Sequence, residues 1–231
     1  MLVFLNSILK DVRVVLDHNE SQTSLRGLGE DQLQLDDIIE NQVRAGARLT
    51  VQMSPRSYLN WTRYTNQYGM VGNYDSASVN MPYVISMPED YVRFGAVKMS
   101  GWKKAVSTYC STSDEEYAMQ QSEFAGVRAT ARKPVAVIAE GSDGGRDLLL
   151  YPFASGDTLQ YFDYCKQPKL EMLGSNKRLD IQDTLYEPFI YITASLVAEV
   201  LKDTDKSNEL MAIAKVMLTV PEEAVETAPS E

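Results

Sequence analysis

The spacing of apolar residues predicts four helices, two in the first part of the chain and two near its end. Apolar positions recur three and four residues apart, as on one helix face, over residues 3–16, 31–53, 187–202 and 209–218. The second of these segments has its acidic residues early and its arginines late, which suits the helix dipole. The third is apolar on more than one side, which predicts a helix buried on two faces, with Phe189, Leu196 and Val200 in its packing.

Between these helices, residues 81–168 contain the shorter apolar runs that are typical of β-strands. Three runs, at 134–139, 147–153 and 158–164, are separated by turns of glycine, serine and aspartate and predict a small antiparallel meander. Residues 91–99 are expected as a strand or a helical turn. The predicted fold class is therefore mainly α with a small antiparallel β insertion (α+β), that is, a helical bundle that carries a β-hairpin or meander.

No linker or internal repeat divides the chain, so the sequence predicts a single domain over residues 1–220. Residues 221–231 then contain four glutamates and no Lys or Arg. A segment of this composition predicts an acidic C-terminal tail that is solvated unless a partner orders it.

The charge of the chain argues against one class of function. The net charge is −10, whereas a face that grips nucleic acid needs clustered Lys and Arg. The only paired bases are Lys103-Lys104 and Arg132-Lys133, and each pair is too short to form a nucleic-acid patch by itself. Hydrophobic residues at 44% and charged residues at 23% are ordinary for a globular protein.

The cysteines and the apolar runs indicate in which cellular compartment the protein is expected. Cys110 and Cys165 are too few and too far apart to be a disulfide framework, so reduced thiols are expected, with a single disulfide between them left open. No apolar run approaches the ~20 residues of a membrane helix, and the N-terminal segment lacks the basic start of a signal peptide. We expect no membrane contact, and a protein kept in the cytoplasm or in a particle assembled there.

Few residues suggest chemistry. His18 is the only histidine, which removes the usual Ser-His-Asp and Cys-His arrangements and zinc sites built from several histidines. The glycine-rich run 141–145 lacks the spacing of a phosphate-binding loop and is expected to be a turn. The visible carboxylate clusters are contiguous in sequence and fit a solvated face. We therefore expect no catalytic residue, no metal site and no cofactor, and a protein that is not an enzyme.

Residues 58–74 are rich in aromatic and amide side chains and poor in aliphatic ones. Three interpretations are open for their rings: they cap the core, they form a protein interface, or they form a platform for sugars or bases. The aromatic residues concerned are Tyr58, Trp61, Tyr64, Tyr68 and Tyr74.

The end of the chain carries a resemblance to a known family. An apolar strand, Leu148-Leu-Leu-Tyr, ends at Pro152, a second strand over 158–164 carries aromatic residues before Pro168, and a long helical segment follows. With a helical N-terminal part before it, this order resembles the adaptor (head-completion) proteins that sit under the portal of tailed bacteriophages. The aromatic segment at 58–74 and the length of the region 91–130 depart from the compact members of this family, which leaves open a larger ring protein of the podovirus or crAss-like type.

The resemblance implies a head-to-tail connector subunit in the neck of a virion that assembles in the cytoplasm of a bacterial host. By this resemblance, twelve copies would form a ring on the portal protein, extend the DNA channel and offer a surface to tail or further neck proteins. DNA would pass through the channel without sequence-specific binding. The family docks to the portal largely through its C-terminal segment, which corresponds to residues 209–231.

Two groups of residues are the candidate oligomer or partner interface. The first is taken from the aromatic segment and the second from the last predicted helix: Tyr58, Trp61, Tyr64 and Tyr68, and then Leu210, Ile213 and Met217. Other functions remain as alternatives. Within the virion they are another neck or tail-completion protein or a minor capsid protein. Outside it they are a carboxylate-dependent glycan hydrolase, or a glycan- or protein-binding module that uses residues 58–74.

Overall fold

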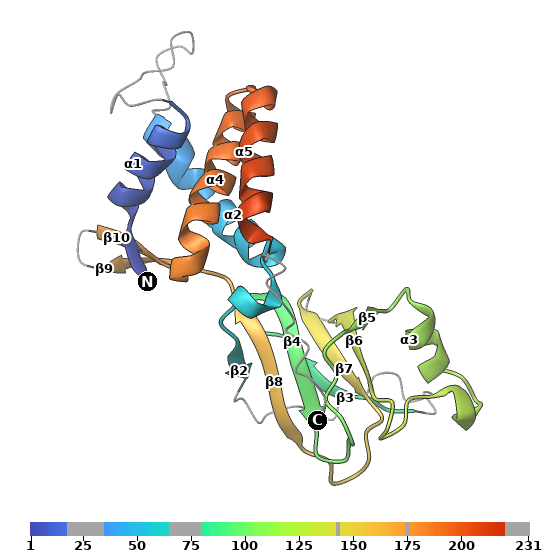
Figure 1. Cartoon of the computed structure of the whole chain (residues 1–231). Helices are drawn as coiled ribbons and strands as arrows, with labels where there is room; N and C mark the ends of the chain where they lie inside the picture. Colours follow the sequence, from blue (N-terminus) through green and yellow to red (C-terminus); the bar gives the residue numbers. More distant parts are fainter. Residues whose placement is uncertain (18–34, 65–79, 142–143, 174–175, 220–231) are drawn as a thin grey trace, which may run out of the picture. The chain divides into compact units, whose positions relative to one another are not determined.

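The computed structural model describes residues 1–17, 35–64, 80–141, 144–173 and 176–219 (Figure 1). Its contacts divide the chain into two compact units: a helical unit, Met1–Asn60 with Gln167–Glu231, and a β unit, Trp61–Lys166. The single domain expected over 1–220 thus comprises two units, and each is described by itself below. The acidic tail expected at 221–231 lies outside the described residues.

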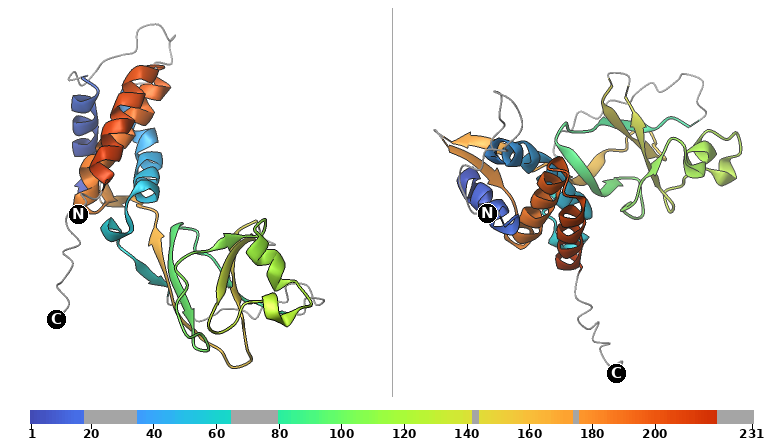
Figure 2. Two further views of the ribbon diagram at one scale, coloured as in Figure 1. Left: turned by 45° about the vertical axis from the view of Figure 1, so that its right-hand side comes forward. Right: turned by 90° about the horizontal axis from the view of Figure 1, so that it is seen from above.

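The helical unit is built around one central helix. Helices α1, α2 and α5 each pack on α4 (Figures 1 and 2). The burial of α4 confirms the helix expected to be covered on more than one side, because buried residues such as Phe189, Ala194 and Ser195 lie on different sides of it. The bounds of the helices are α1 (Leu5–Val15), α2 (Leu35–Met53), α4 (Asp183–Val200) and α5 (Thr204–Leu218), with a short 3-10 helix over Arg56–Tyr58.

The ends of these helices differ from the predicted ones for local reasons. Helix α5 begins five residues before the expected position 209, because the side chain of Asp203 accepts a hydrogen bond from the Lys206 backbone N–H at 3.1 Å and caps the helix. Helix α4 begins at Asp183 and includes Pro188, which was expected to mark its start. Helix α1 begins at Leu5 because residues 2–4 form a strand.

That strand belongs to a small sheet that the sequence did not predict. Its order is β1-β10-β9, and both pairs are antiparallel. Val3 and Leu179 pair on its buried side, whereas Phe4 and Arg178 pair on the other side, with the guanidinium 4.5 Å from the ring centroid. The strands are β1 (Leu2–Phe4), β9 (Leu170–Leu173) and β10 (Asn176–Asp180).

Helices α2 and α4 approach closely where Gly46 faces Thr193. A Cβ atom at position 46 would overlap Thr193 Oγ1 and lie 3.2 Å from Thr193 Cα. Thr193 is fully buried, and its hydroxyl has no hydrogen-bond partner among the described residues. A glycine is therefore needed at this position for packing rather than for backbone conformation.

We expect the substitution Gly46→Ala to lower the free energy of unfolding by about 1–3 kcal/mol, because the new methyl group overpacks the contact. Combining it with Thr193→Ala, which removes the overlapping atom, should recover part of that loss. Chemical denaturation of the single and double variants measures both effects. Gly126→Ala is the matched control, since a Cβ there would meet nothing within 4 Å. Equal effects at the two glycines would contradict the close approach.

The β unit consists of two sheets that share one core. One sheet has the order β2-β8-β4 and the other the order β3-β7-β6-β5. The first comprises β2 (Thr62–Tyr64), β8 (Leu159–Lys166) and β4 (Tyr91–Met99), and the second comprises β3 (Tyr83–Ser86), β7 (Arg146–Tyr151), β6 (Val135–Glu140) and β5 (Cys110–Ser111). Phe94 and Phe162 of the first sheet and Ile85 and Leu148 of the second belong to one buried cluster.

The second sheet is covered on both faces. Leu148 and Leu150 of β7 face the cluster shared with the first sheet, whereas Leu149 and Tyr151 face a second cluster that includes Tyr117 of α3 (Glu115–Gln120). A strand buried on both sides needs apolar residues at every position, which explains the continuous run from Leu148 to Tyr151. A second 3-10 helix, Ala125–Val127, follows α3.

The predicted fold class is wrong. About 41% of the described residues are helical and 29% are in strands, in three sheets, so the fold is mixed α/β rather than mainly α. The expected hairpin of 134–139 and 147–153 is confirmed as β6 and β7. The third strand of the expected meander does not join it: β8 pairs with β4 and β2, because both edges of β7 are occupied by β6 and β3.

Candidate assembly surface on the helical unit

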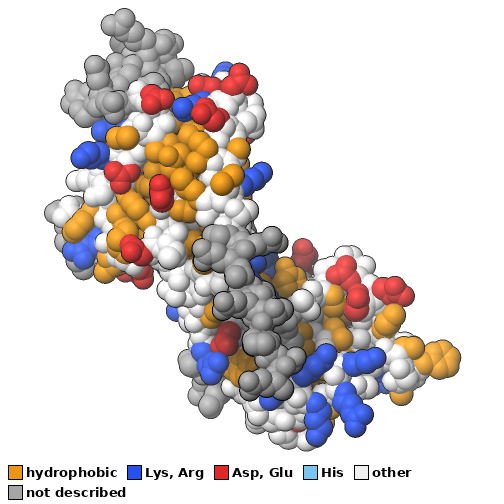
Figure 3. Space-filling view, in the orientation of Figure 1, with side chains coloured by type: hydrophobic (Ala, Val, Ile, Leu, Met, Phe, Trp, Pro, Cys, Tyr) orange, Lys and Arg blue, Asp and Glu red, His pale blue; other side chains and the backbone are white. Residues whose placement is uncertain are grey.

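One side of α5 carries a strip of partly exposed residues that changes from charged to apolar along the helix. We define the α5 strip as Lys206, Glu209, Ile213, Val216 and Met217, which lie on one face because they are three or four residues apart. Val216 is 71% exposed, and Ile213 and Met217 are half-buried. Figure 3 shows hydrophobic side chains gathered on the face of the unit where α4 and α5 lie.

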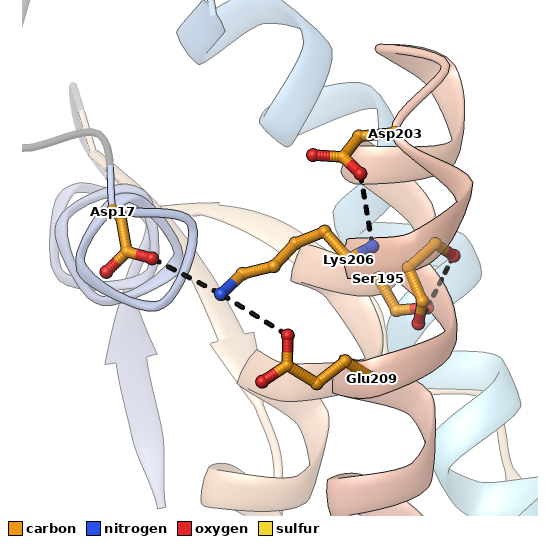
Figure 4. Close-up of polar contacts among 6 residues, drawn as sticks. Asp17, Ser195, Asp203, Lys206 and Glu209 are labelled. Carbon is orange, nitrogen blue, oxygen red and sulfur yellow. Dashed lines mark hydrogen bonds and ion pairs between the residues drawn. The ribbon is translucent and has the colours of Figure 1, made fainter.

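The charged end of the strip forms an ion pair with Asp17 at the end of α1. Lys206 Nζ lies 3.2 Å from an oxygen of Asp17 and 3.8 Å from an oxygen of Glu209 (Figure 4). The hydrogen bond to Asp17, together with both negative charges, raises the pKa of Lys206 above its usual value. Lys206 therefore stays charged and joins the end of α1 to the start of α5.

Helix α5 is also held closely against α4. Ser195 Oγ lies 2.9 Å from the carbonyl oxygen of Ser207 and 3.0 Å from its hydroxyl (Figure 4), and both residues are buried. Ala194, Ala198 and Ala214 are buried in the same pair of helices. Small residues allow two helices to approach closely, and the shared hydroxyl contacts satisfy their polar atoms. The α5 strip is thus presented by a well-packed helical hairpin.

The apolar end of the strip is the part without an obvious role in the fold. Single exposed apolar residues are common on protein surfaces, but Ile213, Val216 and Met217 are neighbours within one turn of α5. Their helix has a separate buried face, which includes Ser207, Ala214 and Leu218. A cluster of this kind is suited to contact another protein.

The residues proposed from the last predicted helix divide between core and surface. Leu210 is only 2% exposed and belongs to the core of the helical unit, whereas Ile213 and Met217 lie on the α5 strip. Val216 was missed, although its spacing of three residues from Ile213 could have suggested it. Val200, expected in helix packing, is half exposed.

The residues proposed from the aromatic segment are not one described cluster. Tyr58 is a half-buried residue of the helical unit, whereas Trp61 and Tyr64 belong to the β unit. Trp61 packs over Gly95, and the Tyr64 ring lies 6.0 Å from that of Phe162 in the core. Tyr68 and Tyr74 lie outside the described residues. For Tyr64, the structure agrees with a ring that caps the core.

No protein-family model matches this chain, and no curated protein matches it in sequence. The resemblance described above therefore rests on the order and pattern of elements.

Other candidate chemical groups occupy ordinary structural positions. Cys110 and Cys165 do not form a disulfide. Burial, and then the nearby charges of Glu116 and Asp114, raise the pKa of Cys110 to about 11, so its thiol stays protonated and weakly nucleophilic at neutral pH. The described residues of the run 141–145 lie between the paired strands β6 and β7, and the Gly141 N–H donates to the Gly145 carbonyl at 2.9 Å, as expected for a turn. Residues 142–143 lie outside the described residues.

Two kinds of feature are absent from the described ranges. They contain no group of three or more His, Cys, Asp or Glu side chains placed to hold a metal ion. Within the same ranges, every helix is too short or too polar to cross a membrane. His18 lies outside the described residues.

Proposed function

We propose that the chain is a structural subunit of the head-to-tail connector of a tailed bacteriophage. It would act as an adaptor that forms a ring below the portal, extends the DNA channel and offers a surface to the tail. The observation that carries this proposal is the α5 strip. Its exposed apolar residues lie in the segment 209–231, which corresponds to the part of the adaptor proteins that docks to the portal.

The apolar end of the strip has the chemistry of an assembly contact. Burying a valine or methionine side chain that is exposed in the isolated protein contributes about 1.5–3 kcal/mol. Val216 is the most exposed large apolar residue of α5, and Ile213 and Met217 lie beside it. These three side chains would form the apolar centre of a contact with the portal, and Glu209 and Lys206 would lie at its charged edge.

A ring requires a second contact, between neighbouring copies. Head-to-tail contacts that close under rotation use two different patches of the same subunit. The helical unit has other exposed apolar residues, among them Leu2 on β1 and Val14 on α1. The proposal assigns contact with the portal to the α5 strip and leaves contact between copies to other surfaces.

The test is native mass spectrometry of the purified chain, alone and with the portal protein of the same phage. The expected result is a complex of about twelve copies, either of the chain alone or on the portal ring. Val216→Asp should weaken portal binding at least tenfold, since it places a charge in an apolar contact. The matched control is Val127→Asp, the same change at a 48% exposed position of the β unit, which should bind normally. A wild-type monomer that does not bind the portal would exclude the proposal.

A further inference from the structure

The β unit brings together two pairs of basic residues that are separate in the sequence. Lys103-Lys104 lies in the loop after β4, and Arg132-Lys133 lies just before β6. The Lys103 backbone N–H donates to the carbonyl oxygen of Ala131 at 2.7 Å, so the first pair touches the residue directly before the second pair. All four side chains are exposed. We call these four residues the basic loop pair.

Both loops are anchored in the core. On the first loop, Trp102 is buried and its Nε1 donates to the Pro152 carbonyl at 2.9 Å, and Val106 exchanges two backbone hydrogen bonds with Val97. On the second loop, Thr130 and Lys133 exchange two backbone hydrogen bonds. Because the backbone beneath the charges is already ordered, little entropy is lost there when a ligand binds.

The charge around the basic loop pair is locally unbalanced. Residues 91–113 and 124–139 contain seven Lys and Arg and no Asp or Glu. Among the described residues, none of the four side chains forms an ion pair. One carboxylate, that of Asp157, lies beside Gly101, and it accepts hydrogen bonds from Ser100 and from the Ala154 backbone N–H. Figure 3 shows Lys and Arg side chains gathered on one face of the β unit.

The net charge of the whole chain conceals this distribution. The β unit carries ten Lys and Arg against twelve Asp and Glu, whereas the rest of the chain carries twelve against twenty. Charges farther away than the Debye length, about 8 Å at physiological salt, are largely screened. A local cluster of four positive charges can therefore bind an anion on a chain that is acidic overall.

We propose that the basic loop pair binds the phosphate backbone of a nucleic-acid duplex without reading its sequence. Each of the three lysines and the arginine can contact a phosphate group, since lysine acts as a point charge and arginine donates in a fork. The apolar side chains that flank the first pair, Trp102 and Val106, are buried, so they offer no apolar anchor beside Lys103 and Lys104 for a protein partner. Such binding requires only a single copy of the chain, and it does not depend on ring formation or on a portal.

The test measures the affinity of the full chain for a fluorescent DNA duplex of about 30 base pairs, by anisotropy, across ~50–200 mM salt. Four phosphate contacts predict a slope of log affinity against log salt of about −3.6, which is a loss of about a hundredfold over that range. Lys103→Gln/Lys104→Gln should make the slope shallower by about 1.8, and Arg132→Gln/Lys133→Gln should do the same. The same chain with a duplex of another sequence should give the same affinity.

The matched control is Lys10→Gln/Lys169→Gln, which changes the net charge equally at exposed positions of the helical unit. It should leave both the affinity and the slope unchanged. No binding of the wild type at the lowest salt would overturn the inference, and so would equal binding by the basic loop variants. Tighter binding to polyglutamate or to phosphatidylserine vesicles than to the duplex would overturn the assignment to nucleic acid.

Discussion

Replacing Phe162 by alanine is expected to lower the free energy of unfolding of the β unit by about 3–5 kcal/mol. Phe162 is fully buried in the core that the two sheets share. Its ring centroid lies 5.6 Å from that of Tyr164, 5.7 Å from that of Phe94 and 6.0 Å from that of Tyr64. Truncation removes these contacts and leaves a cavity lined by rigid rings, which cannot easily collapse into the space.

Chemical denaturation monitored by tryptophan fluorescence measures this loss, since both tryptophans lie in the β unit. The control is Phe124→Ala, the same substitution in the same unit at a side chain that is 78% exposed. It should change the free energy by no more than about 0.5 kcal/mol. If the two variants were equally stable, Phe162 could not be the centre of the shared core.

Replacing Leu210 by alanine is expected to lower the stability of the isolated chain by about 2–5 kcal/mol. The sequence pattern placed Leu210 with Ile213 and Met217 as an interface residue, whereas the structure buries it. The substitution therefore distinguishes a core residue from an interface residue. A core residue affects stability in the absence of any partner, but an interface residue affects only assembly.

Thermal and chemical denaturation of the monomeric chain give this comparison. Val216→Ala on the same helix should change the free energy of unfolding by no more than about 0.5 kcal/mol, because that side chain is mostly exposed. The same variant should weaken a complex that buries the α5 strip. A stable Leu210→Ala protein would show that position 210 is not packed as described.

The helices could be predicted because their signal is local. In α2, α4 and α5, apolar residues at helical spacing cover the buried faces, and the end of α2 at Met53 agrees with the prediction. Which of the two apolar stripes of α5 is buried cannot be predicted from the local sequence. Leu210 and Val216 both fit helical spacing, and only the position of α4 decides which of them is buried.

Strand partners could not be predicted for the same reason. The runs that form β6, β7 and β8 were recognisable, but β8 pairs with β4 because β3 occupies the remaining edge of β7. The sheet β1-β10-β9 was missed since its strands have three to five residues, too few for an alternating pattern to stand out. The basic loop pair did have a sequence signal, namely two long stretches without any acidic residue, 91–113 and 124–139.

The division of the chain into two units also determines which unit can fold first during synthesis. The β unit is continuous from Trp61 to Lys166, so all its strands exist before α4 is translated. The helical unit is discontinuous: the Met1 amine donates to the Ile181 carbonyl at 2.7 Å, across 180 residues. During synthesis, α1 and α2 therefore leave the ribosome before α4, the helix that covers their apolar faces. The core of the helical unit is completed last.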